Sequence, residues 1–166
     1  METMDRELSE LLRETRFAEG FSEQELQSVA RAGRLHRAGK GTMLFQEGEV
    51  EDEVFVVCSG HVALEMQVPR RGNVRLLTVG SGELVGWSGL TADGRMTASA
   101  VVTEDATLIA LSSKALRELC RSDHELGYLL MTRTARAISQ RLLATRLQLL
   151  DLFAETQPQA RPGQAS

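Results

Sequence analysis

The fold of this chain is decided by the stretch Gly41-Thr42-Met43-Leu44-Phe45-Gln46-Glu47-Gly48-Glu49 and by the one that follows, Val54-Phe55-Val56-Val57-Cys58-Ser59-Gly60-His61-Val62-Ala63-Leu64. Short runs of β-branched and aromatic residues predict strands, and Gly48 and Gly60 suit tight turns that need a positive φ. From Val62 to Val68 every second residue is apolar, which predicts a strand with one face toward solvent. Both stretches therefore indicate β structure punctuated by glycine turns.

Outward from these stretches, the same alternation of apolar runs and glycine-containing turns extends over residues 34–111. The runs predicted as strands are Thr42–Phe45, Glu53–Val57, His61–Val68, Val74–Val79, Glu83–Trp87, Thr97–Thr103 and Ala106–Leu111. Many short strands at this spacing favour an antiparallel β-roll, jelly roll or sandwich. We expect an α+β chain, mainly β, whose central unit is this roll.

Helical periodicity is found on both sides of the roll. Before it, leucines recur at helical spacing, and Ser22 to Glu25 reads as a capping box at a helix start. After it, Ser112-Ser113 opens a short helix, and Ser122 to Glu125 reads as a second capping box. The expected division is 1–33 N-terminal helices packing on the roll, 34–111 the roll, 112–153 C-terminal helices, and 154–166 a disordered tail.

The last predicted helix carries an apolar stripe at spacings that alternate between three and four residues. Its members are Tyr128, Met131, Ala135, Ile138, Leu142, Thr145, Leu149 and Leu152. This is the seam of a coiled coil, and it predicts a homodimer of moderate strength, because Ala135 and Thr145 weaken the seam. The alternative is a single helix lying on its own domain. The arginines of this helix, including Arg133 and Arg141, are interpreted as a solvated face.

The order of helices, glycine-punctuated roll and long helix, with the motifs in Gly39–Leu64, resembles the cyclic-nucleotide-binding domain of the catabolite-activator and fumarate–nitrate regulator superfamily. The resemblance covers roughly residues 15–153. It implies a sensor domain whose phosphate-binding cassette reads Phe-Gly-Glu and then, about nine residues on, Arg-Ser/Thr-Ala. In that family the Glu accepts the ribose 2′-hydroxyl, and the Arg pairs with the cyclic phosphate.

The cassette of this chain departs from the family at both charged positions. Val85-Gly86-Trp87 falls on Phe-Gly-Glu, and Met96-Thr97-Ala98 falls on the Arg motif, with Arg95 one place early. An indole has one N–H donor and cannot replace a carboxylate acceptor. The candidate ligand-binding residues are Val85, Gly86, Trp87, Ser88, Arg95, Thr97 and Ala98. The open alternatives are a cyclic nucleotide, another small anionic ligand stacked on Trp87, and an empty pocket.

Composition and motifs argue against several other functions. The 166 residues carry a net charge of −4, which disfavours nucleic-acid binding, and only thirteen residues follow Phe153, too few for a recognition helix, so we expect no DNA binding by this chain alone. The histidines His36, His61 and His124 are scattered, which predicts no metal site, and no catalytic motif suggests an enzyme.

The expected environment is the cytoplasm. No signal peptide or apolar run long enough for a membrane helix is seen, and Cys58 and Cys120 are interpreted as buried thiols in a reducing compartment, a disulfide being the minor alternative. We therefore expect a non-enzymatic homodimeric sensing module without a cofactor, with a possible protein partner. The alternative is a ligand-free scaffold or protein-interaction domain that keeps the same fold.

Overall fold

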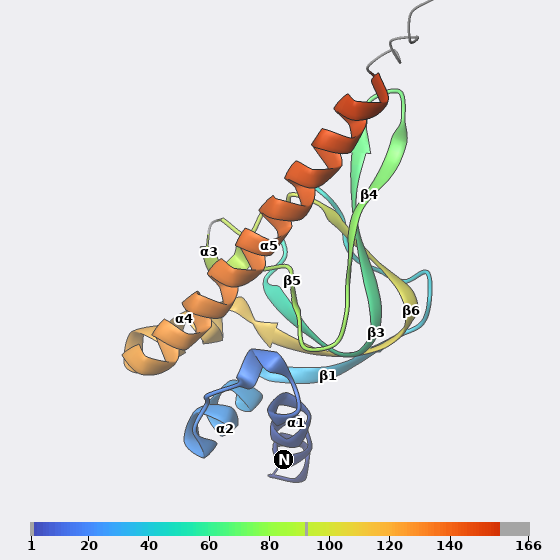
Figure 1. The fold of residues 1–166 in the computed structure, drawn as a ribbon. Helices are drawn as coiled ribbons and strands as arrows, with labels where there is room; N and C mark the ends of the chain where they lie inside the picture. The colour runs from blue at the N-terminus through green and yellow to red at the C-terminus, as the bar shows by residue number, and fades with distance from the viewer. Residues whose placement is uncertain (1, 92, 157–166) are drawn as a thin grey trace, which may run out of the picture.

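The computed structural model describes residues 2–91 and 93–156. Its elements, in chain order, are α1 (Glu2–Arg13), η1 (Arg16–Ala18), α2 (Glu23–Arg31), β1 (Gly33–Ala38), β2 (Met43–Phe45), β3 (Glu53–Val68), β4 (Gly72–Val79), β5 (Leu84–Val85), α3 (Ser88–Thr91), β6 (Ser99–Ser112), α4 (Ser113–Ser122) and α5 (His124–Thr156). The strands form a rolled sheet, with α1 and α2 at one end and α5 running along its side (Figure 1). This confirms the α+β architecture, an antiparallel roll with N-terminal helices and a long final helix.

The sheet is antiparallel, and its strand order is β1-β6-β3-β4, with β2 on β6 and β5 on β3. Four of the predicted runs are joined in pairs, because β3 and β6 are each one long strand. The register between them shifts at several points from Val57 to Val62. Such bulges bend a strand and increase its twist, which lets one long pair curve into a roll.

Gly60 lies inside β3 at this bend, so the predicted tight turn at Ser59-Gly60 is wrong. Its φ of +82° does require glycine. A Cβ at Gly60 would lie 2.4 Å from the carbonyl oxygen of Asp105 and 2.7 Å from the Cα of Ala106. The glycine therefore allows β3 and β6 to approach closely where the sheet curves.

The apolar runs of β3 and β6 are buried on both faces. Phe55 and Val57 lie in the core inside the roll, whereas Val54 and Val56 lie in a second core under the helices. Each fully buried valine contributes about 1.5–3 kcal/mol by leaving water. A strand buried on both faces needs a continuous apolar run, which is why Val54 to Val57 contains no polar residue.

The helices that flank the roll begin with side-chain caps. At α2, Ser22 and Glu25 form the predicted capping box, in which the Ser22 Oγ accepts from the Glu25 N–H and the Glu25 carboxylate accepts from the Ser22 N–H. At α5, the predicted box at Ser122 is wrong, since Asp123 accepts from the Leu126 N–H at 3.0 Å. Ser122 donates to the Leu119 carbonyl instead, because it still belongs to α4.

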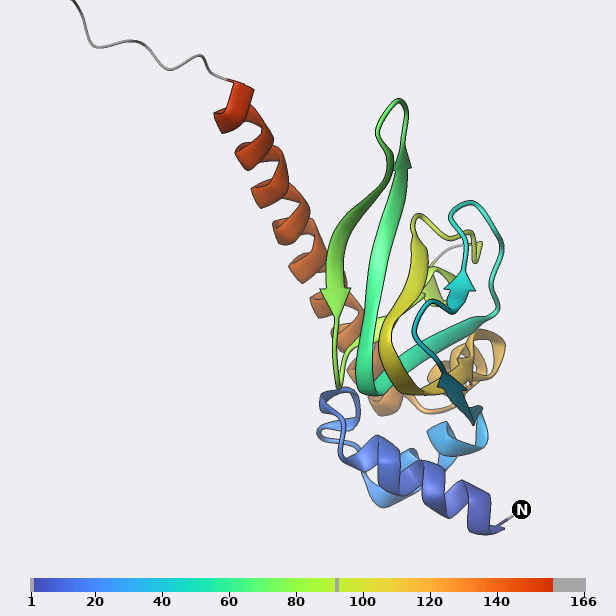
Figure 2. The ribbon, with the colours of Figure 1, turned by 90° about the vertical axis from the view of Figure 1, so that its right-hand side faces the viewer.

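The first half of α5 is anchored in the core, and the second half lies against the roll through polar groups. Leu126 and Leu130 are fully buried. Farther along, Arg141 donates to the Leu84 carbonyl and Gln148 to the Leu76 carbonyl. Figure 2 shows α5 continuing past the body of the roll beside the projecting β3–β4 hairpin. The helix ends at Thr156, three residues beyond the expected end, and the rest of the expected disordered tail lies outside the described residues.

Both cysteines are free and half-buried. Burial, with a smaller effect from the charge of Glu14, raises the pKa of Cys58 to about 11. Burial also raises the pKa of Cys120. Both thiols are therefore protonated at neutral pH. None of the helices in the described part of the chain combines the length and the hydropathy of a membrane span.

Candidate functional site

A cavity of about 330 Å³ lies between the roll, the loop after β5 and helix α5. The β3–β4 hairpin supplies an apolar wall through Leu64, Met66, Leu76 and Leu77, and the segment from Gly86 to Ala98 supplies a second wall. Helix α5 closes the third side. A volume above about 300 Å³ with mostly apolar walls and a few polar groups is typical of small-molecule sites.

The loop after β5 is held in place by two glycines. Gly86 has a φ of +83°, and a Cβ there would lie 3.0 Å from the ring of Phe45. Gly89, in the short helix α3, lies so close to α4 that a Cβ would be 2.3 Å from the Ser113 Oγ. Only glycine fits either position without displacing a neighbour. The loop is therefore fixed to both the roll and α4, with Trp87 and Ser88 between the two anchors.

Trp87 and Arg141 form the most distinctive contact of the cavity. The guanidinium carbon of Arg141 lies 3.8 Å from the centroid of the Trp87 ring, and Arg141 also donates a hydrogen bond to the Leu84 carbonyl. A cation over an indole face is favourable, and more so where water is excluded. Burial lowers the pKa of Arg141 to about 9, an effect that the charge of Glu83 partly offsets. Arg141 is therefore still charged at pH 7.

Five of the seven candidate ligand-binding residues line this cavity. They are Gly86, Trp87, Ser88, Thr97 and Ala98. Val85 is not among the lining residues, since its side chain is fully buried in the core of the roll. Arg95 is exposed on the far side of the loop, where its Nη1 donates to the Gly48 carbonyl at 2.7 Å.

Met96, at the position of the family arginine, forms part of the cavity wall and is buried in the core of the roll. Its backbone is fixed by two hydrogen bonds, from its N–H to the Glu49 carbonyl and from the Gly48 N–H to its carbonyl, each 2.8 Å long. The register of this segment is therefore held, and a shift by one residue that would bring Arg95 inward breaks both bonds. The loop itself supplies no cation to the cavity.

The cation comes from α5, and the sequence interpretation missed it. Arg141 was grouped with the solvated arginines, but it is half-buried between the cavity and the roll. One signal in the sequence points to it: with Met96 at the position predicted for the cassette arginine, an anion-binding site would lack a cation in the cassette itself. Locating the replacement needs the tertiary structure, because nothing local to α5 places Arg141 opposite Trp87.

Three residues of α5 belong both to the cavity and to the predicted seam. Ile138, Leu142 and Thr145 line the cavity and occupy consecutive seam positions. The seam is exposed along its length in the single chain; Tyr128, for example, is 72% and Leu149 50% accessible. A contiguous exposed apolar stripe of this length is typical of an interaction surface. The geometry thus places a candidate ligand cavity directly behind a candidate dimer surface.

A comparison with known protein families matches residues 35–123 to the cyclic nucleotide-binding domain. The chain belongs to the cyclic nucleotide-binding domain family. Within that family it is 35% identical to a cyclic AMP receptor protein of Thermus thermophilus over 109 aligned residues. The alignment covers 63% of this chain and 49% of that protein. It is 28% identical over 115 residues to a CRP-like cAMP-activated global transcriptional regulator of Mycobacterium tuberculosis, over 69% of this chain and 49% of that protein. The chain spans about half the length of these relatives.

Solved structures of cyclic nucleotide-binding domains share the fold. A domain from Methylobacillus flagellatus superposes with a TM-score of 0.75 at 20% identity, covering 96% of this chain and 88% of that one. The catabolite activator protein of Thermus thermophilus superposes with a TM-score of 0.66 at 27% identity, covering 83% of this chain and 62% of that one. The resemblance drawn from the sequence motifs is therefore confirmed, and the relatives are binding proteins and regulators.

Proposed function

We propose that this chain is a non-enzymatic sensing module that binds a small, nucleotide-like anion in the cavity beneath Trp87 and acts as a homodimer through α5. The observation that carries the proposal is the pairing of Trp87 with the half-buried Arg141 in the wall of that cavity. An aromatic ring and a single cation suit a ligand that combines a planar ring with a separate negatively charged group, such as a phosphate.

The charge balance of the cavity favours an anionic ligand. Within residues 2–91 and 93–156, Arg141 is the only arginine or lysine that lines the cavity, and no carboxylate lines it. The nearby charge of Glu83 offsets only part of the cost of desolvating Arg141, and an anion that binds beside Arg141 in the cavity offsets more of it. The hydroxyl groups of Ser88 and Thr97 are further donors on the opposite wall.

The departures from the family cassette bear on which ligand is bound. Relatives of the chain include a cyclic AMP receptor protein, and a regulatory domain of Toxoplasma gondii has the same fold in complex with cAMP. In this chain Trp87 replaces the carboxylate that would accept a ribose hydroxyl, and the charge is contributed by Arg141 instead of residue 96. We therefore expect the ligand to be selected by stacking and charge, with weaker dependence on the ribose.

Ligand binding and dimerisation are coupled in this proposal. A ligand that contacts Ile138 or Leu142 from the cavity side moves or stiffens the same side chains that form the seam. If the ligand binds one position of α5 more tightly than another, binding shifts α5 toward that position and so changes the surface that it presents to a partner protein.

A thermal-shift panel of cyclic AMP, cyclic GMP, cyclic di-GMP and linear purine nucleotides tests the proposal. A ligand present at 100 times its dissociation constant stabilises the fold by about 2.7 kcal/mol, which is readily measured. We expect Arg141→Met to abolish the shift and Arg95→Ala to retain it, since Arg95 does not line the cavity. A panel that is silent throughout favours the ligand-free scaffold.

A further inference from the structure

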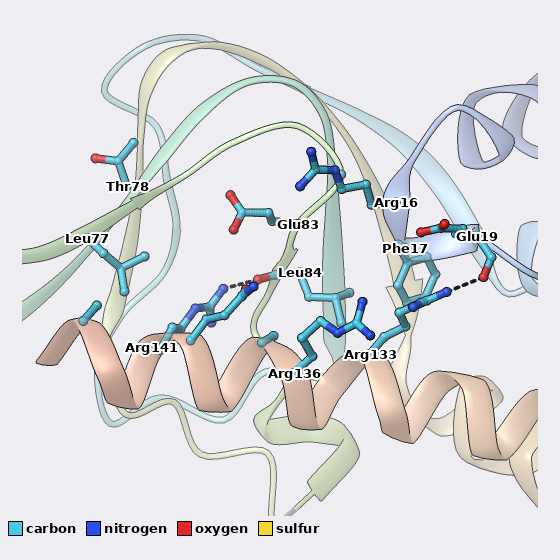
Figure 3. Close-up of a pocket in the computed structure, with 14 residues that line it drawn as sticks. Arg16, Phe17, Glu19, Leu77, Thr78, Glu83, Leu84, Arg133, Arg136 and Arg141 are labelled. Carbon is cyan, nitrogen blue, oxygen red and sulfur yellow. Dashed lines mark hydrogen bonds between the residues drawn. The ribbon is translucent and has the colours of Figure 1, made fainter. Parts of the chain in front are cut away.

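A second cavity, of about 430 Å³, lies on the other side of Arg141 from the Trp87 cavity. Figure 3 shows Arg133, Arg136 and Arg141 extending from α5 on one side and Arg16, from η1, on the other. Phe17, Leu77 and Leu84 form the apolar part of its walls. We call it the arginine pocket.

The arginine pocket carries an excess of positive charge. Four arginines line it, against the two carboxylates of Glu19 and Glu83, so two positive charges are in excess. None of the ion pairs found in residues 2–91 and 93–156 includes an arginine of this pocket. The Glu83 carboxylate accepts from the Gly80 N–H at 2.7 Å and so stabilises the turn before β5.

One donor in the pocket is buried without a partner. Arg133 donates through its Nη2 to the Glu19 carbonyl, but its Nε is buried and has no hydrogen-bond partner in the described residues. A buried, unsatisfied N–H is rare in native proteins and calls for a group that completes it. Arg136 is exposed at the pocket, and its side chain has no hydrogen bond or ion pair with any residue that the structure describes.

The arginine pocket also faces away from the predicted dimer seam. Its α5 residues are Arg133, Arg136, Ala137, Gln140, Arg141 and Ala144, none of which is a seam position. Because residues three or four apart share a helix face, these residues other than Arg141 lie on a different side of α5 from the seam, and Arg141, three residues after Ile138 and four before Thr145, lies at the border between the two sides. A dimer formed through the seam therefore leaves the pocket accessible.

We infer that the arginine pocket is a second binding site, specific for a small molecule that carries a diphosphate group. Guanidinium groups from two elements can bind the oxygens of two linked phosphates, each through paired hydrogen bonds. The pocket volume lies within the range of about 300–1,000 Å³ that is typical of small-ligand sites. The diphosphate can belong to inorganic pyrophosphate or to a nucleoside diphosphate, in which case Phe17 and Leu77 border the organic part.

Isothermal titration calorimetry of the full chain with pyrophosphate and, separately, with ADP tests this inference. We expect saturable binding that weakens with salt, and a loss of about tenfold or more in affinity in Arg136→Gln and in Arg16→Gln, since each removes a charge-assisted hydrogen bond. Arg71→Gln, at the exposed tip of the β3–β4 hairpin, is the matched control and should leave binding unchanged. Comparing the two probes shows whether the organic part contributes.

The inference is overturned if neither probe binds at millimolar concentration, or if Arg136→Gln and Arg16→Gln bind as tightly as the unmodified chain. Circular dichroism of each variant confirms that a lost affinity does not come from unfolding. Trp87→Phe separates this site from the one proposed above, because Trp87 does not line the arginine pocket. Binding of pyrophosphate should survive Trp87→Phe even if the Trp87 cavity binds nothing.

Discussion

At the scale of single residues, this chain differs from the family pattern in where the cation of the cavity lies. The cassette segment contributes no cation to the cavity, and α5 contributes Arg141. Met96 and Trp87 occupy the positions of the two charged cassette residues, and Arg141 brings a cation from a different element. The apolar and glycine positions could be predicted because they follow local rules of period and φ. Arg141 could not, since its role depends on a contact between segments far apart in sequence.

Replacing Arg141 should separate stability from binding. Burial lowers its pKa in the folded chain to about 9, so the folded state binds fewer protons than the unfolded chain between pH 9 and the ordinary pKa of arginine. The destabilising contribution is therefore fully present below pH 9 and declines as the pH rises above that value. We expect Arg141→Met to unfold at pH 7 at a urea concentration no lower than that of the unmodified chain. A large loss of stability would show that Arg141 is a structural residue.

Gly60, the one glycine of β3, should not be replaceable by a residue with a side chain without a large loss of stability. In Gly60→Ala the new methyl group meets the backbone of Asp105 and Ala106, so we expect a loss of about 3 kcal/mol or more, as for other overpacked core sites. Gly41 has a similar φ of +91° with nothing within 4 Å of its Cβ, so Gly41→Ala should lose only about 1–2 kcal/mol from backbone strain. Urea unfolding measures both, and equal losses would contradict the close approach of β3 and β6.

At the scale of elements, α5 shows what a periodic pattern can and cannot predict. The seam from Tyr128 to Leu152 is continuous and exposed, as expected of a face that is left for a partner. The leucines beside the seam were expected to include the face that packs on the roll, and only the early ones, such as Leu126, are buried. Farther along, the contact with the roll is made by Arg141 and Gln148, because there α5 meets backbone carbonyls of β4 and β5.

The seam can be tested with two leucines of nearly equal exposure. Leu149, in the seam, is 50% accessible, and Leu147, outside it, is 53% accessible. A charge placed at a seam position opposes association, whereas the same charge outside the seam is solvated. Sedimentation velocity should show Leu149→Glu as a monomer at concentrations where Leu147→Glu remains a dimer. Identical behaviour of the two variants would argue for a different interface or for a monomer.

At the scale of the whole molecule, the roll and α5 enclose a cavity that neither forms alone. The order of strands and helices follows from the sequence pattern because each apolar run supplies one face or both faces of a core. The cavity could not be predicted from the sequence pattern, since its walls come from β3, β4, the loop after β5 and α5 together. The cavity is lined by the seam residues Ile138 and Leu142. A ligand bound in the cavity therefore contacts the same side chains that α5 offers to a second copy of the chain.

Fluorescence of Trp87 tests the central claim most directly, because it is the only tryptophan in the chain. Its ring lines the cavity in contact with Arg141, so a ligand that binds there changes the environment of the indole. Titration with cyclic AMP, cyclic GMP and cyclic di-GMP should give a saturable change in emission with at least one of them, and that change should be lost in Arg141→Met. Emission that stays constant with all three, or a change that persists in Arg141→Met, would contradict this account.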